Sequence, residues 1–481
     1  MSELTSQRRL LVLGICCMSL LIVSLDNTIL NVALPSIGRE LDASVSGLQW
    51  TIDAYTLVLA SLLMLAGSTA DRIGRRKVFM AGLVLFTLGS ALCSVAPSLE
   101  LLVVFRMVQA VGGSMLNPVA MSIITNTFTD PAERARAIGV WGGVVGISMA
   151  AGPLIGGLLV DSVGWRSIFW VNLPVGLAAL LLTWRYVPES RAPRPRRADP
   201  VGQLLVIALL GSLTYAIIEK SPVAAAVAAV ALLGVLLYEP RRREPLIDLR
   251  FFRSAPFSGA TVIAIAAFAA LAGFLFMNTL YLQEVRGYSA LHAGLYMLPM
   301  AGLTFVCAPL SGRLVGSRGP RLPLVVAGAT MAASGLLFAI FQAETSNALL
   351  FTGYVLFGIG FGLVNAPITN TAVSGMPRAQ AGVAAAVAST SRQIGATLGV
   401  AVIGTVLASG VATAAGAAAR STAYADSFAD ASRTAWWIIA GCGFLVLLVG
   451  ALTTGSWAQG TALSCAHRLE EPELSPEPSR T

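Results

Sequence analysis

The sequence predicts an all-α membrane protein in which fourteen transmembrane helices form two six-helix bundles with an inserted central pair. Of the 481 residues, 56% are hydrophobic and only 12% are charged, whereas a soluble globular chain carries about 25% charged residues. Fourteen apolar segments of membrane-spanning length follow one another, and the loops between them alternate in basic content. So few charges cannot cover a soluble protein of this length, so lipid must cover most of the surface.

The apolar segments follow one another along most of the chain. Each is close to the roughly 20 residues that a helix needs to cross a bilayer. The first begins after Arg8 and Arg9, has no small-residue cleavage site behind it and precedes further spans, so it is a membrane helix rather than a signal peptide. The expected spans are 10–33, 48–68, 78–96, 99–120, 137–160, 167–187, 201–218, 222–238, 256–280, 291–311, 322–342, 348–369, 382–408 and 434–455.

The spans divide the chain into two halves around a central region. Residues 1–187 are expected to form an N-terminal six-helix bundle and residues 254–455 a C-terminal one. Between them, residues 188–253 hold cytoplasmic linkers and a two-helix hairpin without counterpart in either half. The Pro- and Arg-rich stretch from Pro188 to Pro200 is typical of a solvated linker. Residues 456–481 are expected to be a disordered cytoplasmic tail.

Two weak echoes indicate that the bundles are repeats of one unit. The loop after span 2, Gly67–Lys77, and the loop after span 10, Gly312–Arg321, are both rich in Gly and Arg. Span 1 carries Asp26–Asn31 near its outer end, and span 9 carries Asn278–Gln283 near its end. Internal repeats at matching places in two halves are typical of secondary transporters.

The basic residues give the orientation. An even number of spans puts both termini on one side of the membrane. If the N-terminus is cytoplasmic, that side holds 24 of the 32 Lys and Arg residues, the outer side holds six, and Arg106 and Arg392 lie inside spans. Cytoplasmic loops carry an excess of basic residues, so both termini are expected in the cytoplasm. One span more or fewer would destroy this alternation.

Three ionisable residues lie inside spans of the first bundle. Asp26, Asp53 and Arg106 fall on spans 1, 2 and 4, and at about 1.5 Å per residue all three lie roughly 7–10 Å below the outer surface. An ionised side chain at the bilayer centre costs about 2.5–3.5 kcal/mol, so each needs a partner or a function. Helices 1, 2 and 4 of one bundle could bring these residues together.

Alternative interpretations of these charges stay open. Asp26 and Arg106 either form a purely structural ion pair or take part in proton binding. Asp53 either stays hydrated in an outer vestibule or binds a proton or a cationic ligand, but not easily both, because burial penalises an unpaired charge. Such exclusive binding is the physical requirement for proton/cation exchange. Arg392, beside Gln393 in span 13, either lines the cavity or binds backbone carbonyls.

Small residues and a proline shape span 5. Span 5 carries Gly142, Gly146, Gly152, Pro153 and Gly156. Small residues at four-residue spacing let helix backbones touch in lipid, and the proline removes a backbone donor and bends the helix. A bent, closely packed helix suits a rocking interface between halves, although simple tight packing would use the same residues.

Composition and spacing exclude several other classes. The net charge of +8 comes from short, scattered Arg clusters, which fit anionic lipid head groups better than nucleic acid. The six Cys and two His show no metal-ligand spacing, so no metal site is expected. No phosphate-binding Gly-rich loop occurs, which argues against an ATP-driven pump. We therefore expect no cofactor.

In its motifs, the chain resembles the major facilitator superfamily, and within it the fourteen-helix drug:proton antiporters. The loop Gly67–Lys77 is similar to the superfamily motif between helices 2 and 3, with Thr69 in place of the usual Leu. Five other segments are similar to motifs of this branch: Leu25–Pro35, Trp50–Tyr55, Arg106–Gly113, Gly142–Gly157 and Trp165–Gly176. The fourth resembles the helix 5 motif associated with export. Together and in order, these motifs are specific, and the resemblance runs from about residue 10 to 455.

The resemblance implies roles for individual residues. Asp26 and Arg106 would couple proton binding to transport, with Arg106 helping to set the proton affinity of Asp26. Asp53 would contact a cationic drug. Gln109, one turn from Arg106, and Arg392 are further substrate-binding candidates. The second bundle has no evident membrane-embedded carboxylate, which argues against divalent or multiply charged substrates.

The same resemblance implies two moving parts. The gating loop comprises Gly67, Asp71, Arg72, Gly74 and Arg75. Asp71 and Arg72 would hold the inward gate, with Asp71 facing a helix N-terminus or an Arg across the gate. The antiporter helix is span 5, in which Gly152 and Pro153 would form a flexible elbow.

The resulting hypothesis is a proton-coupled antiporter that exports hydrophobic, cationic drugs or antibiotics from the cytoplasm by alternating access. We expect a monomer in the inner membrane of a bacterium, with the small-molecule substrate, protons and the lipid bilayer as its partners. A dedicated exporter of an endogenous metabolite or siderophore stays open, and a membrane-embedded enzyme or receptor is a remote alternative. The enzyme alternative lacks any Ser/His/Asp or metal cluster.

Overall fold

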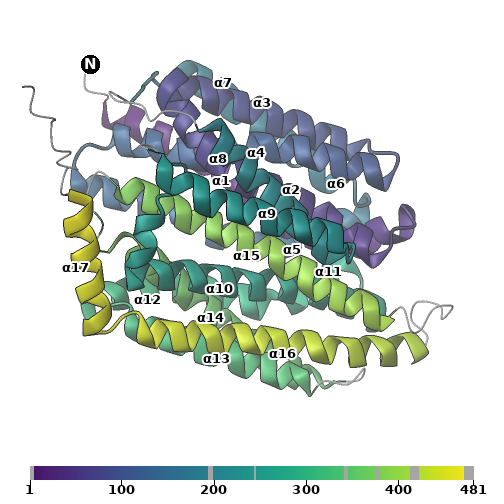
Figure 1. Cartoon of the computed structure of the whole chain (residues 1–481). Coiled ribbons are helices and arrows are strands. Elements are labelled where there is room, and N and C mark those ends of the chain that lie inside the picture. Colours follow the sequence, from purple (N-terminus) through teal and green to yellow (C-terminus); the bar gives the residue numbers. More distant parts are fainter. Residues whose placement is uncertain are drawn as a thin grey trace, which may run out of the picture.

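The protein is a bundle of long, nearly parallel helices (Figure 1). The computed structural model describes residues 5–192, 199–242, 245–340, 345–374, 376, 380–411 and 422–470. Within these ranges the chain forms helices and no strand, and fourteen helices are long and apolar enough to cross a membrane. This confirms the predicted all-α membrane class and the count of spans. Residues 193–198 of the expected linker and 471–481 of the expected tail lie outside the described residues.

The N-terminal half contains the first six spans. Its helices are α1 (Ser6–Glu40), α2 (Val45–Ile73), α3 (Arg75–Ser94), α4 (Leu99–Thr127), α5 (Pro131–Ser162), α6 (Ser167–Trp170) and α7 (Asn172–Tyr186). Ser44 and Ser98 cap α2 and α4 by accepting a backbone N–H of the first turn. Glycines let α3 and α4 touch, because a Cβ on Gly89 or Gly112 would collide with the facing backbone.

The C-terminal half repeats this arrangement. Its helices are α10 (Ala255–Leu280), the π-helix η3 (Tyr281–Val285), α11 (Ala290–Tyr296), α12 (Leu298–Arg318), α13 (Arg321–Ala339), α14 (Asn347–Val373), α15 (Ala381–Val411) and α16 (Thr422–Leu452). Helix α3 packs on α4 and α7 as α13 packs on α14 and α16, and α1 packs on α5 as α10 packs on α15. The two halves are therefore related by a pseudo-repeat in packing, as the weak sequence echoes suggested.

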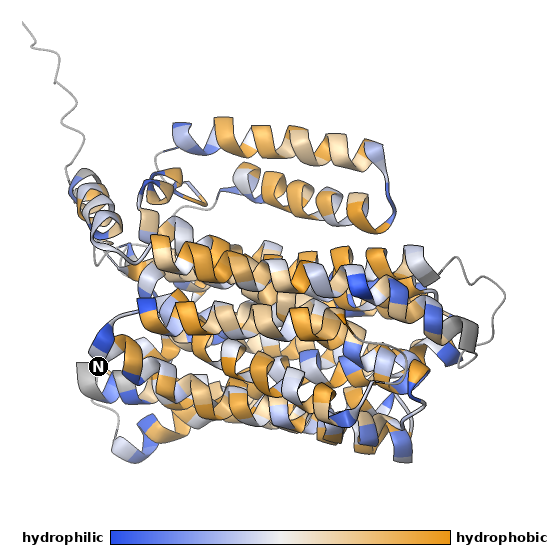
Figure 2. Cartoon of the chain, turned by 90° about the horizontal axis from the view of Figure 1, so that it is seen from below, coloured by the Kyte–Doolittle hydropathy of each residue, from blue (hydrophilic) through white to orange (hydrophobic). Residues whose placement is uncertain are grey.

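The inserted hairpin lies along one side of the bundle (Figure 2). It consists of α8 (Pro200–Ile218) and α9 (Pro222–Tyr238), followed by the short 3-10 helices η1 (Glu239–Arg241) and η2 (Leu249–Arg253). Helix α8 packs on α2 of one half and α15 of the other. The Gln203 side chain donates to the carbonyl of Ser61, and the Thr405 hydroxyl donates to that of Ile217 at 3.2 Å. The hairpin thus lies against the seam between the halves.

Three expected spans differ from the helices of the structure in where they break or end. Expected span 6 is broken at Val171 into α6 and α7. Expected span 10 starts as the separate helix α11 and breaks at Met297, before Pro299, which lacks a backbone donor. Expected span 9 does not end at residue 280 but continues as η3.

The expectation of a disordered tail is wrong for its first part, because Ser456–Glu470 form helix α17. This helix packs on α10 and η2 and crosses the end of the bundle in Figure 1. The Thr461 hydroxyl accepts the backbone N–H of Ala255 at 3.0 Å, and the thiol of Cys465 lies 3.5 Å from the carbonyl oxygen of Arg250. These contacts with the start of the C-terminal half account for its order.

Candidate functional site

A buried ion pair lies at the centre of the N-terminal half. Asp26 on α1 and Arg106 on α4 are joined through one guanidinium nitrogen and Oδ2 at 2.5 Å. Arg106 is fully buried and Asp26 is 5% exposed. The structure therefore pairs two of the three charges that were expected in one layer. In such a position the attraction between the charges must offset the loss of their hydration.

Neutral side chains complete the hydrogen bonds of this carboxylate. Gln109 of α4 and Asn172 of α7 donate to Oδ1 of Asp26 at 2.8 and 2.9 Å. Asn172 also donates to the hydroxyl of Ser90 on α3, which in turn donates to a backbone carbonyl. Asp26 thus accepts three hydrogen bonds from two helices besides its own, and these bonds tie α1 to α4 and α7. We call Asp26, Arg106, Gln109, Asn172 and Ser90 the proton-site network, after the role that the sequence analysis expects of Asp26 and Arg106.

Gln109 occupies a different place from the one expected of a substrate-binding residue. It is fully buried. Its amide nitrogen donates to Asp26, and its amide oxygen accepts from Arg106 at 2.7 Å. Both polar ends are therefore used inside the proton-site network, because Gln109 lies one turn from Arg106 on the same face of α4. Asn172 was not among the expected site residues, since its contact with α1 depends on how α7 packs.

An aromatic ring covers the other side of the guanidinium. The centre of the Arg106 guanidinium lies 4.1 Å from the centroid of the Tyr55 ring on α2. Arg106 also donates through Nε to the carbonyl of Thr51 at 3.4 Å. A cation over an aromatic face is attracted by the ring quadrupole, most strongly where water is absent. Helices α1, α2, α4 and α7 thus all contact the network.

Asp53 lies apart from this network. It is fully buried on α2, and within the described part of the chain neither carboxylate oxygen has a hydrogen-bond partner. Gln49 and Thr56, one turn on either side, bond to α15 of the other half: Gln49 donates to the carbonyls of Val400 and Ala401, and the hydroxyls of Thr56 and Thr397 are 2.9 Å apart. Asp53 is therefore in the stretch of α2 that bonds to the opposite half, and in this conformation it is buried and does not face a vestibule.

The contacts between the halves gather at the predicted outer end. Gln283 of η3 donates to the carbonyl of Val32 at 2.8 Å, and Arg39 pairs with Glu284 at 2.8 Å. The carboxylate of Asp161, at the end of α5, accepts the backbone N–H groups of residues 290 and 291 at 3.1 and 2.9 Å. These bonds hold the outer ends of the two halves together.

The glycines of α5 are also packed more closely towards its predicted outer end. A Cβ on Gly142 would meet nothing within 4 Å, and one on Gly146 would lie 3.0 Å from the ring of Phe305 in the other half. Further along, a Cβ on Gly152 would collide with Thr28, and one on Gly156 would lie 3.2 Å from Ile29. The closely packed part of the antiporter helix is therefore its predicted outer part, against α1 and the C-terminal half.

A small pocket lies between the halves beside Pro153. Residues of α1, α5, α10 and the α11–α12 segment line it: Thr28, Asn31, Val32, Met149, Pro153, Leu275, Thr279, Met297, Met300 and Ala301. Three of these are Met, whose flexible side chains adapt to irregular apolar surfaces. The sequence analysis named none of these residues as ligand contacts, and Pro153 only as part of the elbow of span 5, because apolar and hydroxyl side chains on separate helices carry no local motif.

The expected gating loop makes its contacts within the N-terminal half. Asp71 pairs with Arg75 of the same loop at 2.9 Å, so its arginine partner does not come from across the gate. Gly74 has φ +132°, and the Glu189 carboxylate lies against it, which leaves no room for a Cβ. Glu189 also accepts the backbone N–H of Arg76 at 3.1 Å. This contact, which the sequence analysis missed, ties the loop to the end of the first half.

The remaining loop residues make few contacts. Arg72 is exposed, and a Cβ on Gly67 would be 3.8 Å from Pro118 of α4.

Arg392, the other expected substrate contact, lies on α15. It donates to the hydroxyl of Thr369 on α14, and its guanidinium lies 6.0 Å from the ring centroid of Phe268 on α10. It therefore sits in the C-terminal half, where its contacts in the described structure are with side chains.

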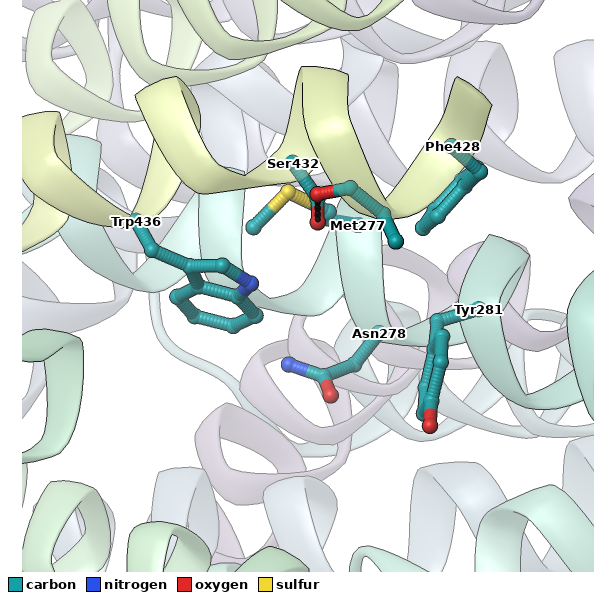
Figure 3. A pocket seen from close by; sticks show the side chains of 7 residues that line it. Met277, Asn278, Tyr281, Phe428, Ser432 and Trp436 are labelled. Carbon is teal, nitrogen blue, oxygen red and sulfur yellow. Dashed lines mark hydrogen bonds between the residues drawn. The ribbon is translucent and has the colours of Figure 1, made fainter. Parts of the chain in front are cut away.

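A second pocket lies inside the C-terminal half, between α10 and α16. Met277, Asn278, Tyr281, Phe428, Ser432 and Trp436 line it together with Ala429. Figure 3 shows Asn278 between Trp436 and Tyr281, with Ser432 across the pocket. The Asn278 amide oxygen accepts the Tyr354 hydroxyl at 3.0 Å. Asn278 and Ser432 contribute polar side chains to this pocket, and the aromatic residues Tyr281, Phe428 and Trp436 line the rest of it together with Met277 and Ala429.

The sequence matches one known family and several named relatives. Residues 16–400 match the Major Facilitator Superfamily. Multidrug resistance protein Stp of Mycobacterium tuberculosis is 40% identical over 410 residues, 83% of this chain and 76% of that protein. The Tetracenomycin C resistance and export protein of Streptomyces glaucescens is 38% identical over 399 residues, 80% and 73% of the two chains. Multidrug efflux pump LfrA of Mycolicibacterium smegmatis is 34% identical over 411 residues, 84% and 81%.

Solved structures share the fold. A bacterial homolog of the human lysosomal transporter Spinster, in an inward-facing and occupied conformation, superposes with a TM-score of 0.69. The superposition covers 95% of this chain and 99% of that one, at 18% sequence identity. At this identity the likeness concerns the fold alone, and it agrees with the two-bundle architecture described above.

Proposed function

Since this chain belongs to the major facilitator superfamily, we propose that it is a proton-coupled antiporter that exports hydrophobic, cationic drugs or antibiotics from the cytoplasm. The observation that carries the proposal is the proton-site network, in which a carboxylate and a guanidinium are buried together inside a transport bundle. The names of the relatives, multidrug and antibiotic exporters at 34–40% identity, support the substrate class.

The network can connect proton binding to movement of α1. Protonation of Asp26 would remove the charge that Arg106, Gln109 and Asn172 stabilise, and would weaken the hold of α4 and α7 on α1. Thr28, two residues along α1, lines the pocket between the halves. A change in the charge of Asp26 would therefore move the part of α1 that a substrate would contact.

Asp53 supplies the second element of exchange. Its carboxyl is buried without a hydrogen-bond partner among the described residues while the outer ends are in contact. A charge without a partner is costly at such a position. A conformation that separates α2 from α15 would expose Asp53, where a proton or an organic cation could bind, but not easily both. We therefore assign Asp53 to recognition of cationic substrates.

The available energy is sufficient for such export. One proton that enters down about 100 mV yields roughly 2.3 kcal/mol, and one pH unit adds about 1.4 kcal/mol. Together these can hold a substrate gradient of several hundredfold.

We further assign both termini to the cytoplasm and the protein to the bacterial inner membrane, as a monomer. The excess of basic residues on the side of the N-terminus supports this orientation. The outer-end contacts at Gln283, Glu284 and Asp161 then belong to a closed outer gate, and substrate would enter from the cytoplasmic side.

Export of one dedicated natural product is the second candidate. The observation in its favour is the 38% identity to the Tetracenomycin C resistance and export protein. The same proton machinery would serve both functions, and only the pocket between the halves would differ.

The test is ethidium accumulation in inverted membrane vesicles with an imposed proton gradient. We expect ethidium uptake by the wild type, and we expect both a protonophore and the variant Asp26→Asn to abolish it. The variant Asp53→Asn should lose uptake of cationic drugs but keep uptake of neutral drugs. Asp42→Asn, the same change at an exposed loop residue with positive φ, is the control. Proton-independent ethidium transport, or full coupling in Asp26→Asn, would refute the mechanism. A well-expressed wild type without ethidium transport would favour the dedicated exporter.

A further inference from the structure

Two residues of the C-terminal half occupy the positions that the Asp26–Arg106 pair holds in the N-terminal half. Helices α4 and α14 are the fourth spans of their halves, and each starts at a Ser whose hydroxyl accepts a backbone N–H at 3.4 Å. Arg106 lies eight residues after Ser98, and Tyr354 lies eight residues after Ser346. Tyr354 is therefore the positional counterpart of Arg106.

The first spans of the two halves, α1 and α10–η3, also carry matching residues. On α1, Asn31 follows Asp26 by five residues, and on α10–η3, Gln283 follows Asn278 by five. Asn31 and Gln283 both lie where the halves meet, the first lining the pocket between them and the second bonding to α1. Asn278 accepts the Tyr354 hydroxyl at 3.0 Å, as Asp26 accepts the Arg106 guanidinium. The same two helices are joined in each half, once by an ion pair and once by a neutral hydrogen bond.

The surroundings differ in chemistry in the same way. Three residues after Arg106 stands Gln109, which bonds to Asp26, whereas three residues after Tyr354 stands Phe357. Phe357 stacks on Phe274 of α10, with ring centroids 4.1 Å apart. Phe338 and Trp436 close the cluster, stacked on each other at 4.4 Å. An aromatic cluster in the C-terminal half thus replaces the polar side chains of the proton-site network.

We propose that Asn278 and Tyr354 are an uncharged counterpart of the proton site, which holds α10 against α14 without exchanging protons, so that proton movement is confined to the N-terminal half. The inference rests on the proposed function. A carboxamide does not titrate, and the phenyl rings of Phe274, Phe338 and Phe357 have no hydrogen-bond donor that could stabilise a carboxylate there. In the six described spans of the C-terminal half the carboxylates are Glu284, Asp426 and Asp430, all near the predicted outer end. Glu284 pairs with Arg39, and the other two are exposed.

The titratable groups beside the pair fit this assignment. Tyr281 lines the same pocket as Asn278, and the guanidinium of Arg286 lies 5.6 Å from the centroid of the Tyr281 ring. Arg286 is held at the outer end by the Tyr281 hydroxyl at 2.9 Å and by a backbone carbonyl. The neutral pair therefore fixes α10 just before η3, whose Gln283 bonds to α1. In this arrangement α1 responds to protons while α10 serves as a fixed support.

The test compares matched positions in the two halves. The pH dependence of ethidium export is measured in inverted vesicles for Asn172→Leu and Gln109→Leu in one half, and for Asn278→Leu and Tyr354→Phe in the other. We expect the first two variants to move the midpoint of the pH profile by about one unit or more, because each removes a hydrogen bond to the Asp26 carboxylate. We expect the second two to lower the rate only and to leave the midpoint within about 0.3 units.

The outcomes separate this inference from the proposed function. If Tyr354→Phe or Asn278→Leu moves the midpoint as far as Asn172→Leu does, the C-terminal pair takes part in proton movement and the inference is wrong. For a variant that folds but does not transport, proton release on adding ethidium to the purified protein replaces the vesicle assay. If the variant releases as many protons as the wild type, the inference is supported. If the variant releases fewer protons, the inference is contradicted. If Asp26→Asn keeps its proton dependence, the proposed function fails, whatever the C-terminal variants do.

Discussion

Breaking the buried ion pair from one side should destabilise the protein more than removing it altogether. In Asp26→Asn, the Arg106 guanidinium keeps its charge at a fully buried position but loses the carboxylate 2.5 Å away. One guanidinium nitrogen, Nη2, already has no hydrogen-bond partner in the described structure, so the loss is not readily compensated. Removing one partner of a buried pair costs about 3–5 kcal/mol. We expect the double variant Asp26→Asn/Arg106→Gln to recover most of this loss.

The assay is unfolding of the purified protein in detergent, together with vesicle transport. The two measurements should separate: the double variant regains stability, but neither variant shows proton-coupled export. If the double variant regains transport as well, the pair is purely structural, which was the alternative left open by the sequence. Equal stability of Asp26→Asn and the wild type would show that Arg106 does not depend on Asp26, and the reasoning about the network would be wrong.

Further predictions concern glycines at close contacts, with Gly139→Ala, where a Cβ meets open space, as the common control. Gly74→Ala should lower the unfolding free energy by about 1–3 kcal/mol, because its φ is +132°, a backbone conformation that residues with a Cβ rarely adopt, and because the Glu189 carboxylate would also have to move. Unfolding of the purified variant measures this, and a wild-type transition would contradict it. Gly157→Ala should separate the outer ends of the halves, because a Cβ there would collide with the backbone of Leu291. Faster hydrogen exchange in residues 287–297 is the expected sign, and unchanged exchange would show that the contact can shift without opening.

The sequence predicted the architecture because hydropathy and charge alternation are local properties. All fourteen expected spans correspond to helices, although α2 runs from Val45 to Ile73 where residues 48–68 were expected. The helices extend beyond the apolar core, since polar end turns can remain helical in the head-group region. The break at Met297 was missed because a short apolar helix and the start of the next one look like a single span.

The candidate site was predictable only in part. Asp26 and Arg106 stand out because charges inside apolar runs are rare, and depth along the helices placed them in one layer. The role of Asn172 was not predictable, since an Asn near a span end has many neutral explanations. Glu189 and Gln109 show the same limit: which polar atoms meet depends on how helices pack, and spacing along the chain does not determine it.

The comparison of the two halves supports the proposal that the charges serve transport rather than folding. A buried ion pair is weak evidence for stability, because apolar groups of similar volume often replace it without loss. In this chain such a replacement exists at the matching place, where Asn278, Tyr354 and stacked aromatic rings join α10 to α14. The architecture can thus close this helix pair without charge. The N-terminal half nevertheless buries Asp26 and Arg106 and surrounds them with donors, which a protein that only needed a packed core would not require.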